Sequence, residues 1–177
     1  MTAEEKTQDY LEKAEEFKLG SLTTEQQHPG TRELSDWANS DIPKALQVIQ
    51  EIDTEVVRTA AGRVEELDYL ASQIEETRAG GGRIFLSGCG ATGRLSLTLE
   101  YLWRESYAPS GREDEVVAFM AGGDLALVKA IEDFEDHPEY GARQLRELGF
   151  RQGDMLIAIT EGGETPFVIG TAEEAAK

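Results

Sequence analysis

The 177-residue sequence has little of what disulfide frameworks and metal sites require. Cys89 is its single cysteine, so no internal disulfide can form and nothing suggests an oxidising compartment. His28 and His137 each stand beside a proline, with no Cys or His companion at metal-ligand spacing, and we expect both at the surface. No Ser, His and Asp set supports nucleophilic hydrolysis. We therefore expect neither a metal nor a cofactor.

Basic residues are also scarce. The chain has 17 Lys and Arg against 35 Asp and Glu, a formal charge of −18. Nucleic acids and anionic membranes both need a basic face, so this charge argues against either as a general partner. It does not exclude one small phosphorylated ligand, which local donors can hold. The acidic field would slow the arrival of such a ligand.

Long hydrophobic runs are missing from the sequence as well. No segment approaches the roughly 18 consecutive apolar residues of a membrane span, and residues 1–20 are charged, unlike a secretory signal. We expect a cytoplasmic protein. With 40% hydrophobic residues, the chain suits one domain and can bury a real core.

The first 40 residues predict a helix followed by an arm. Residues 3–18 carry a narrow apolar stripe among charged residues, which indicates an exposed helix that stops at Gly20. Residues 21–37 have little periodicity and contain a Pro-Gly turn, so we expect an extended arm. An arm of this length either wraps the surface or reaches a partner subunit.

Residues 41–82 predict a long helical segment that ends at three glycines. Ser40 or Asp41 can cap it, and Gly62 can divide it into two helices. Its apolar stripe is longer than one sheet face usually needs. Part of the stripe is therefore expected to pack against another helical surface or a second subunit.

Residues 83–177 alternate between strand and helix patterns, which indicates an α/β fold with a parallel sheet. The first helix has apolar residues at 95, 99 and 102, a rhythm typical of a helix lying on a sheet. The last strand is continuously apolar, as in a parallel strand covered on both faces. We expect strands at 84–86, 115–121 and 155–160, and helices at 95–104, 124–135, 139–148 and 167–177.

Two glycine turns each follow a strand and open a helix. The first contains Gly88, Gly90 and Gly93 with the hydroxyl of Thr92, and the second spans residues 161–166. Unpaired N–H groups at a helix N-terminus suit a phosphate or carboxylate, although such glycines can also serve close packing alone. In a sheet with strand order 2-1-3, both turns lie at one edge, where ligands bind.

Cys89 and Arg94 each allow two interpretations. The thiol is either a small group where little room exists or a nucleophile activated by the helix terminus. Arg94 either contacts phosphate or pairs with an acid such as Glu100 or Asp124.

The motifs together resemble the sugar isomerase (SIS) domain family, and most closely its branch of N-acetylmuramic acid 6-phosphate etherase and glucokinase regulatory protein. The resemblance covers roughly residues 22–177. It rests on five stretches in matching order, which are residues 22–29, 88–94, 121–124, 135–136 and 159–170.

The resemblance implies a flavodoxin-like three-layer sandwich around a five-stranded parallel sheet. It implies a phosphorylated sugar as ligand, of the amino-sugar 6-phosphate class, and a homodimer in which one chain completes the pocket of the other. It implies a role in amino sugar metabolism. Thr92 matches a phosphate-binding hydroxyl, and Glu135 matches a carboxylate over the sugar. By its position alone, Glu135 at the end of a helix would be interpreted as a solvated acid. The implied binding residues are Gly88, Gly90, Ala91, Thr92, Gly93, Arg94, Gly162, Gly163 and Thr165.

Two matched positions depart from the family. The etherase's second acid falls on Leu102, which cannot move a proton, and Gly162 stands where a phosphate-binding Ser is common. Glu161 and Glu164 flank Gly162 and would repel phosphate unless they point away or accept sugar hydroxyls. Only three of five strands are present, so we expect a fold truncated after the third strand, whose edge would lie bare.

Several functions stay open from the sequence. A lyase of the etherase kind, a sugar-phosphate isomerase and a non-catalytic sugar-phosphate sensor compete, and Leu102 favours the sensor or a changed chemistry. A nicotinamide dinucleotide-binding domain also fits the three glycines, but it expects an acid at the end of the second strand, where residues 121–123 are Ala-Gly-Gly. A structural interaction module built on the long helices of residues 41–79 is a third possibility, and it is compatible with sugar-phosphate binding.

Overall fold

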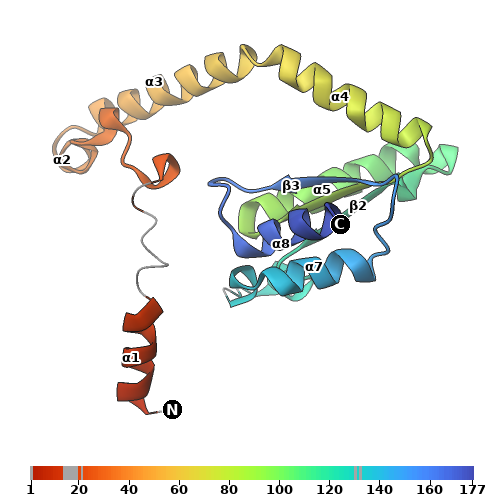
Figure 1. The fold of residues 1–177 in the computed structure, drawn as a ribbon. Coiled ribbons are helices and arrows are strands. Elements are labelled where there is room, and N and C mark those ends of the chain that lie inside the picture. Colours follow the sequence, from red (N-terminus) through yellow and green to blue (C-terminus); the bar gives the residue numbers. More distant parts are fainter. Residues whose placement is uncertain (1, 14–19, 21, 130, 132) are drawn as a thin grey trace. The chain divides into compact units, whose positions relative to one another are not determined.

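The computed structural model describes residues 2–13, 20, 22–129, 131 and 133–177 (Figure 1). Contacts divide the chain into two units, Met1–Val64 and Glu65–Lys177. The predicted boundaries at residues 40 and 82 differ from this division, because helix α4 (Val64–Ala79) groups almost entirely with the α/β part.

The first unit holds helices α1 (Ala3–Lys13), α2 (Leu34–Ser40) and α3 (Ile42–Ala61). The predicted cap of the long segment is confirmed, because Oδ1 of Asp41 accepts a hydrogen bond of 3.1 Å from the Lys44 N–H. The predicted division is also confirmed, since α3 ends just before Gly62. Residues 14–18 of the first predicted helix lie outside the described residues.

The predicted extended arm is partly wrong. Besides α2, it contains short 3₁₀ turns at Thr23–Glu25 and Pro29–Thr31. Local polar bonds that periodicity does not reveal hold the second turn: the Gly30 N–H donates to Nδ1 of His28, and the Thr31 hydroxyl donates to the His28 carbonyl.

The second unit is a flavodoxin-like α/β sandwich that holds three parallel strands. Its sheet has the order β2-β1-β3, as predicted, and pairs Gly88 of β1 with Met120 and Ile159. The elements after α4 are β1 (Ile84–Gly88), α5 (Gly90–Tyr107), β2 (Val116–Met120), α6 (Leu125–Val128), α7 (Pro138–Glu147), β3 (Met155–Ile159) and α8 (Pro166–Ala175). Short 3₁₀ turns lie at Ala108–Ser110, Glu113–Glu115 and Asp133–Asp136.

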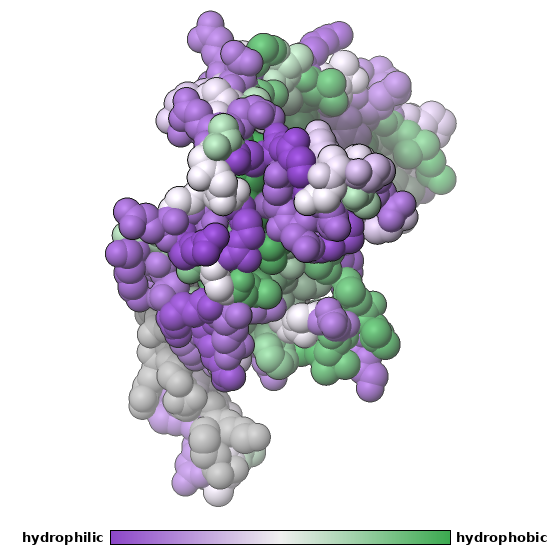
Figure 2. Space-filling model, turned by 90° about the vertical axis from the view of Figure 1, so that its right-hand side faces the viewer, coloured by the Kyte–Doolittle hydropathy of each residue, from purple (hydrophilic) through white to green (hydrophobic). Residues whose placement is uncertain are grey.

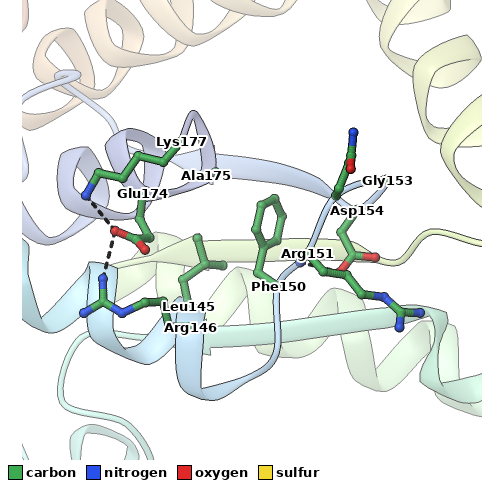
Figure 3. Close-up of a pocket in the computed structure, with 10 residues that line it drawn as sticks. Leu145, Arg146, Phe150, Arg151, Gly153, Asp154, Glu174, Ala175 and Lys177 are labelled. Carbon is green, nitrogen blue, oxygen red and sulfur yellow. Dashed lines mark hydrogen bonds and ion pairs between the residues drawn. The ribbon is translucent and has the colours of Figure 1, made fainter.

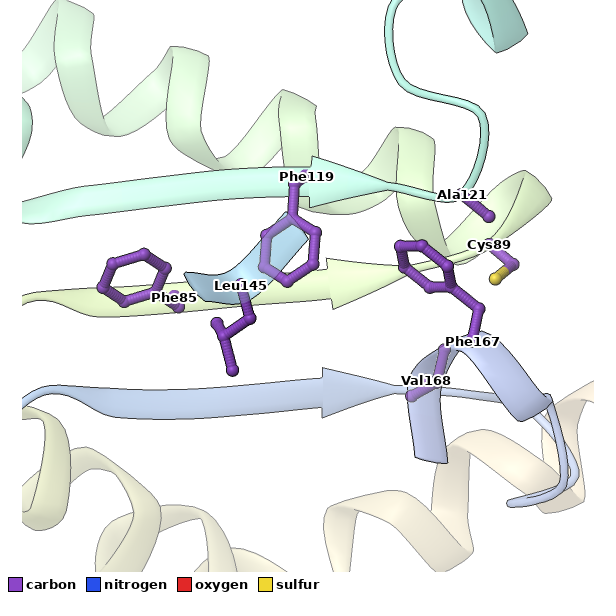
Figure 4. Close-up of a cluster of buried hydrophobic side chains, with 7 residues drawn as sticks. All are labelled: Phe85, Cys89, Phe119, Ala121, Leu145, Phe167 and Val168. Atoms are coloured by element: carbon purple, nitrogen blue, oxygen red, sulfur yellow. The ribbon is translucent and has the colours of Figure 1, made fainter. Parts of the chain in front are cut away.

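Alternate side chains of the strands build a core on each face of the sheet. Phe85 and Phe119 face Leu145 of α7 and Phe167 of α8, and Figure 4 shows this cluster around the strands. On the other face, strand residues such as Leu86 pack with Ile74 of α4 and Trp103 of α5; the buried members there are Ile84, Leu86 and Val116. The sheet is therefore the middle layer of the sandwich, with helices packed on both of its faces.

Helix α5 turns a different side to the sheet from the one predicted. Leu95, Leu99 and Leu102 are 50%, 42% and 53% exposed, so the prediction that this stripe lies on the sheet is wrong. Gly93 and Ser96 are buried instead, and a side-chain oxygen of Glu100 accepts a 3.0 Å hydrogen bond from the Ala118 N–H. Small and polar residues dock α5, and its leucines face outward.

The segment after β2 is less helical than predicted. Helix α6 covers only Leu125–Val128, and Asp124 makes no side-chain cap bond to it. Leu125, Leu127 and Val128 are exposed. Strand β3 is less buried than predicted, since Ala158 is exposed and the other residues of the strand are only partly buried. Among the described residues it pairs with β1 alone, as the predicted bare edge requires. Hydrophobic residues, green in Figure 2, reach the surface at several places on the face drawn there.

Candidate functional site

Two predicted glycine turns lie at the same edge of the sheet. Gly88 ends β1 and Ile159 ends β3, and these two residues are register partners in adjacent parallel strands. The turn after Gly88 opens α5, and the turn after Ile159 opens α8. The backbone N–H groups at two helix N-termini are therefore presented at the carboxyl end of the sheet.

The first turn is closed by the hydroxyl of Thr92. Its Oγ1 donates to the Cys89 carbonyl at 2.9 Å and accepts from the Cys89 N–H at 3.1 Å. Thr92 thus stabilises the start of α5 from its third helical position, with Cys89 as the N-cap residue. A phosphate would receive the hydroxyl hydrogen only if that hydrogen left the Cys89 carbonyl, because a hydroxyl has a single donor.

The three glycines of this turn are needed for different reasons. A Cβ on Gly88 would stand 2.7 Å from the Gly93 nitrogen, and a Cβ on Gly93 would stand 2.6 Å from Cβ of Met120. Both are required by close packing between strand and helix. Gly90 has φ +47° and nothing within 4 Å of an ideal Cβ, so it leaves open space at the start of the helix.

Arg94 pairs with neither Glu100 nor Asp124, the two acids considered from the sequence. Its Nη2 donates a 3.0 Å hydrogen bond to the Ala126 carbonyl and so ties α5 to the segment after β2. Ala91, one helical turn earlier, is exposed. Direct contact of either residue with phosphate stays a prediction.

The second turn contains a hydroxyl pair and a carboxylate that the binding-residue prediction omitted. Oγ1 of Thr165 lies 3.0 Å from Oγ1 of Thr160, while Gly162 and Gly163 are exposed. Oε1 of Glu164 is buried and has no hydrogen-bond partner among the described residues. A buried carboxylate oxygen without a donor is suited to accept a sugar hydroxyl. The sequence already allowed this role for Glu164, because Glu161 and Glu164 flank Gly162 and can accept sugar hydroxyls.

The turn after β2 brings Glu135 into the neighbourhood. The Ala121 N–H donates to the Gly88 carbonyl at 3.2 Å, and Figure 4 shows Cys89 and Ala121 just beyond the ends of their strands. Burial raises the pKa of the Cys89 thiol to about 12, and the charge of Glu135 contributes to the rise. The thiol is therefore neutral near pH 7, which favours the interpretation of Cys89 as a small packing residue.

The cavity of about 650 Å³ beside β3 does not coincide with these turns. Its lining includes residues 151–154, which precede β3, so it lies at the opposite end of that strand. Two of its cations, Arg146 and Lys177, each approach Glu174 to 2.8 Å (Figure 3). The hydrogen bonds from Lys177 and Arg146 lower the pKa of Glu174. Glu174 therefore neutralises much of the positive charge that Arg146 and Lys177 bring to this cavity.

Within the part of the chain that the structure describes, no helix is long and apolar enough to cross a membrane. In the same residues, no three His, Cys, Asp or Glu side chains gather as a metal site would require.

The sequence matches the family model of the glucokinase regulatory protein N-terminal SIS domain over residues 47–175. The chain belongs to the SIS domain family. Its relatives include N-acetylmuramic acid 6-phosphate etherases from Photobacterium profundum (30% identical over 86% of this chain and 49% of the relative), Aeromonas hydrophila (30%, over 89% and 51%) and Rhodopirellula baltica (32%, over 86% and 49%). The chain thus spans about half the length of these relatives.

Leu102, which falls at the position of the etherase's second acid, lies far along α5 from the first glycine turn. Gly90 and Leu102 lie in the same helix, and the rise of an α-helix separates them by roughly 18 Å along its axis. Leu102 is therefore remote from the glycine turn of its own chain.

Proposed function

We propose that this SIS domain binds a phosphorylated sugar at the carboxyl edge of its sheet. The phosphate lies against the start of α5 at Gly90 and Thr92, and the sugar extends toward Glu135 and the second turn. The observation that carries the proposal is the register of β1 and β3, which puts both glycine turns at one edge. The open space at Gly90 and the unpartnered oxygen of Glu164 support it.

An amino-sugar 6-phosphate is the ligand that we propose, because the curated relatives are N-acetylmuramic acid 6-phosphate etherases. Thermal-shift titration of the full-length protein with hexose 6-phosphates and N-acetylmuramic acid 6-phosphate tests the proposal. A saturable rise in melting temperature is expected, because a ligand that binds only the folded state stabilises it. No shift with any of these compounds would refute the proposal.

Leu102 favours a domain that senses a sugar phosphate without catalysing the etherase reaction. Lyase chemistry of the etherase kind needs two carboxyl groups with separated pKa values, and the matched second position cannot ionise. We expect no release of lactate from N-acetylmuramic acid 6-phosphate. Lactate release that Glu135→Gln abolishes would instead establish a lyase with a different second acid. A sugar-phosphate isomerase would convert an aldose phosphate to its ketose without releasing lactate.

A homodimer is the assembly that we propose. The exposed leucines of α5 give it an apolar face. The distance along α5 also places position 102 away from its own glycine turn, where it is suited to meet another subunit. Pairing through this face would let one chain contribute to the pocket of the other.

A further inference from the structure

A second cavity adjoins the turn that follows β2. It has a volume of about 400 Å³, and the residues that matter for its chemistry are Gly122, Gly123, Phe134, Tyr140, Gln144 and Phe167. This volume admits a substituent of several heavy atoms together with water. The 3₁₀ turn Asp133–Asp136, the helix α7 and the start of α8 supply its walls.

Aromatic rings form one wall of this cavity. The rings of Phe134 and Tyr140 lie 5.8 Å apart at 46°, and these side chains are 38% and 41% exposed. Phe167 lines the same cavity and is buried. Partly exposed rings in a cavity with a fixed, buried ring offer a flat group an apolar surface without a rearrangement of the core.

The charges around the cavity are balanced. Arg143 is its cation, and the Arg143 Nε donates to Oε1 of Glu147 at 2.7 Å. Gln144 supplies an amide with both donors and acceptors. A lining with a paired cation and a neutral amide suits an uncharged polar group better than a second phosphate or carboxylate.

The cavity is joined to the candidate site through two short connections. Gly122 follows Ala121, whose N–H donates to the carbonyl of Gly88 in the first glycine turn. Phe134 precedes Glu135, whose charge reaches Cys89 in that same turn. Gly123 has φ +56° and open space around an ideal Cβ, so its backbone is accessible.

We propose that this cavity receives an uncharged planar acylamino substituent of the sugar whose phosphate lies on the first glycine turn. The inference rests on the proposed function and assigns its sugar specificity to Phe134 and Tyr140. The planar amide packs on the aromatic wall, and Gln144 pairs with its polar atoms.

Isothermal titration of the full-length protein with glucose 6-phosphate and N-acetylglucosamine 6-phosphate tests this assignment. The two ligands differ in the group at one ring carbon, a hydroxyl in one and an acetamido group in the other. We expect the N-acetyl sugar to bind roughly tenfold more tightly, a typical value for a small group in a fitted pocket. Tyr140→Ala should abolish this ratio while it leaves the Kd of glucose 6-phosphate within about twofold.

Two control variants make the result specific. Tyr140→Phe keeps the ring and should keep the preference, and Arg146→Lys changes an exposed residue on α7 that does not line this cavity. Unchanged melting temperatures show that each variant is folded. If both sugars bind wild type equally, or Tyr140→Ala weakens both to the same degree, the acylamino assignment is overturned and sugar-phosphate binding stands. If neither sugar binds wild type, both proposals are overturned.

Discussion

Thr92 joins two roles in one hydroxyl at the mouth of the candidate site. Its bonds to the N–H and carbonyl of Cys89 hold the first turn of α5, and the proposed phosphate lies at the same helix terminus. A cap of this kind stabilises a helix even without a ligand. The contribution to folding can therefore be measured separately from binding.

We predict that Thr92→Val lowers the free energy of unfolding by about 1 kcal/mol, because it keeps the shape of the side chain but removes the capping oxygen. Urea denaturation without ligand measures this change. Thr92→Ser retains the hydroxyl and should recover most of the loss. Equal stability of the valine variant and wild type would show that the two hydrogen bonds contribute nothing to folding.

The buried thiol of Cys89 predicts a pH dependence of stability. Burial, with a contribution from the charge of Glu135, raises its pKa from the ordinary 9.0 to about 12. The folded state thus holds the proton more tightly than the unfolded state. The contribution of this group to stability is complete below about pH 9 and is lost as the pH rises from 9 toward 12.

Wild type should accordingly lose unfolding free energy more steeply than Cys89→Ala above pH 9, by up to about 1.4 kcal/mol per pH unit. Urea titrations of both proteins at pH 8, 9 and 10 give the difference, in which other titrating groups cancel. The two curves should run parallel below pH 8.5. Parallel curves throughout would contradict a raised pKa.

At the scale of elements, α7 and α8 pack through glycines on facing sides. A Cβ on Gly141 would stand 2.1 Å from the Phe167 carbonyl oxygen, and a Cβ on Gly170 would stand 2.0 Å from that of Pro138. Backbone therefore touches backbone at this crossing. The approach holds Phe167 and the start of α8 against the sheet.

We predict that Gly141→Ala destabilises the protein by about 3 kcal/mol or unfolds it, because the clash is with backbone that cannot rotate away. Chemical denaturation followed by circular dichroism measures the loss. Gly20→Ala is the matched control, since a Cβ there meets nothing within 4 Å and should change stability little. Similar stabilities of the two variants would show that the helices can separate without cost.

For α5, periodicity predicted correctly that a helix exists but not which of its sides faces the sheet. The stripe of Leu95, Leu99 and Leu102 has the spacing of a buried face, yet Ser96 and Glu100 take that place. Spacing along a helix identifies residues that share a face, but not the surface that the face meets. An apolar stripe that another subunit covers has the same pattern as one that a sheet covers.

At the scale of the whole molecule, substitution of the exposed leucines of α5 tests whether this face forms the proposed dimer. Leu99→Lys should convert a dimer into a monomer in light-scattering chromatography, because it introduces a charge into the apolar face. Gln152→Lys places the same charge at an exposed position outside α5 and should leave the dimer intact. Dissociation by both variants, or by neither, would argue against this face as the interface.

The formal charge of −18 predicts the salt dependence of ligand arrival. An anionic sugar phosphate approaches against the protein field, which extends about 30 Å at 0.01 M salt and about 10 Å at 0.1 M. The association rate should therefore rise with added NaCl, opposite to the behaviour of a basic binding protein. Stopped-flow measurements with glucose 6-phosphate at 10 and 100 mM NaCl test the sign. Glucose, which is uncharged, provides the control.

The sequence by itself determined the strand order, the two glycine turns and the family. Tight turns and buried parallel strands each require particular residue types over a short stretch, and few other residues can take their place. Only the tertiary structure decided what the residues of the turns touch. It assigned Gly88 and Gly93 to close packing and Thr92 to the cap of α5, and it left Gly90 open. Such contacts depend on how distant segments meet, and spacing along one chain does not carry that information.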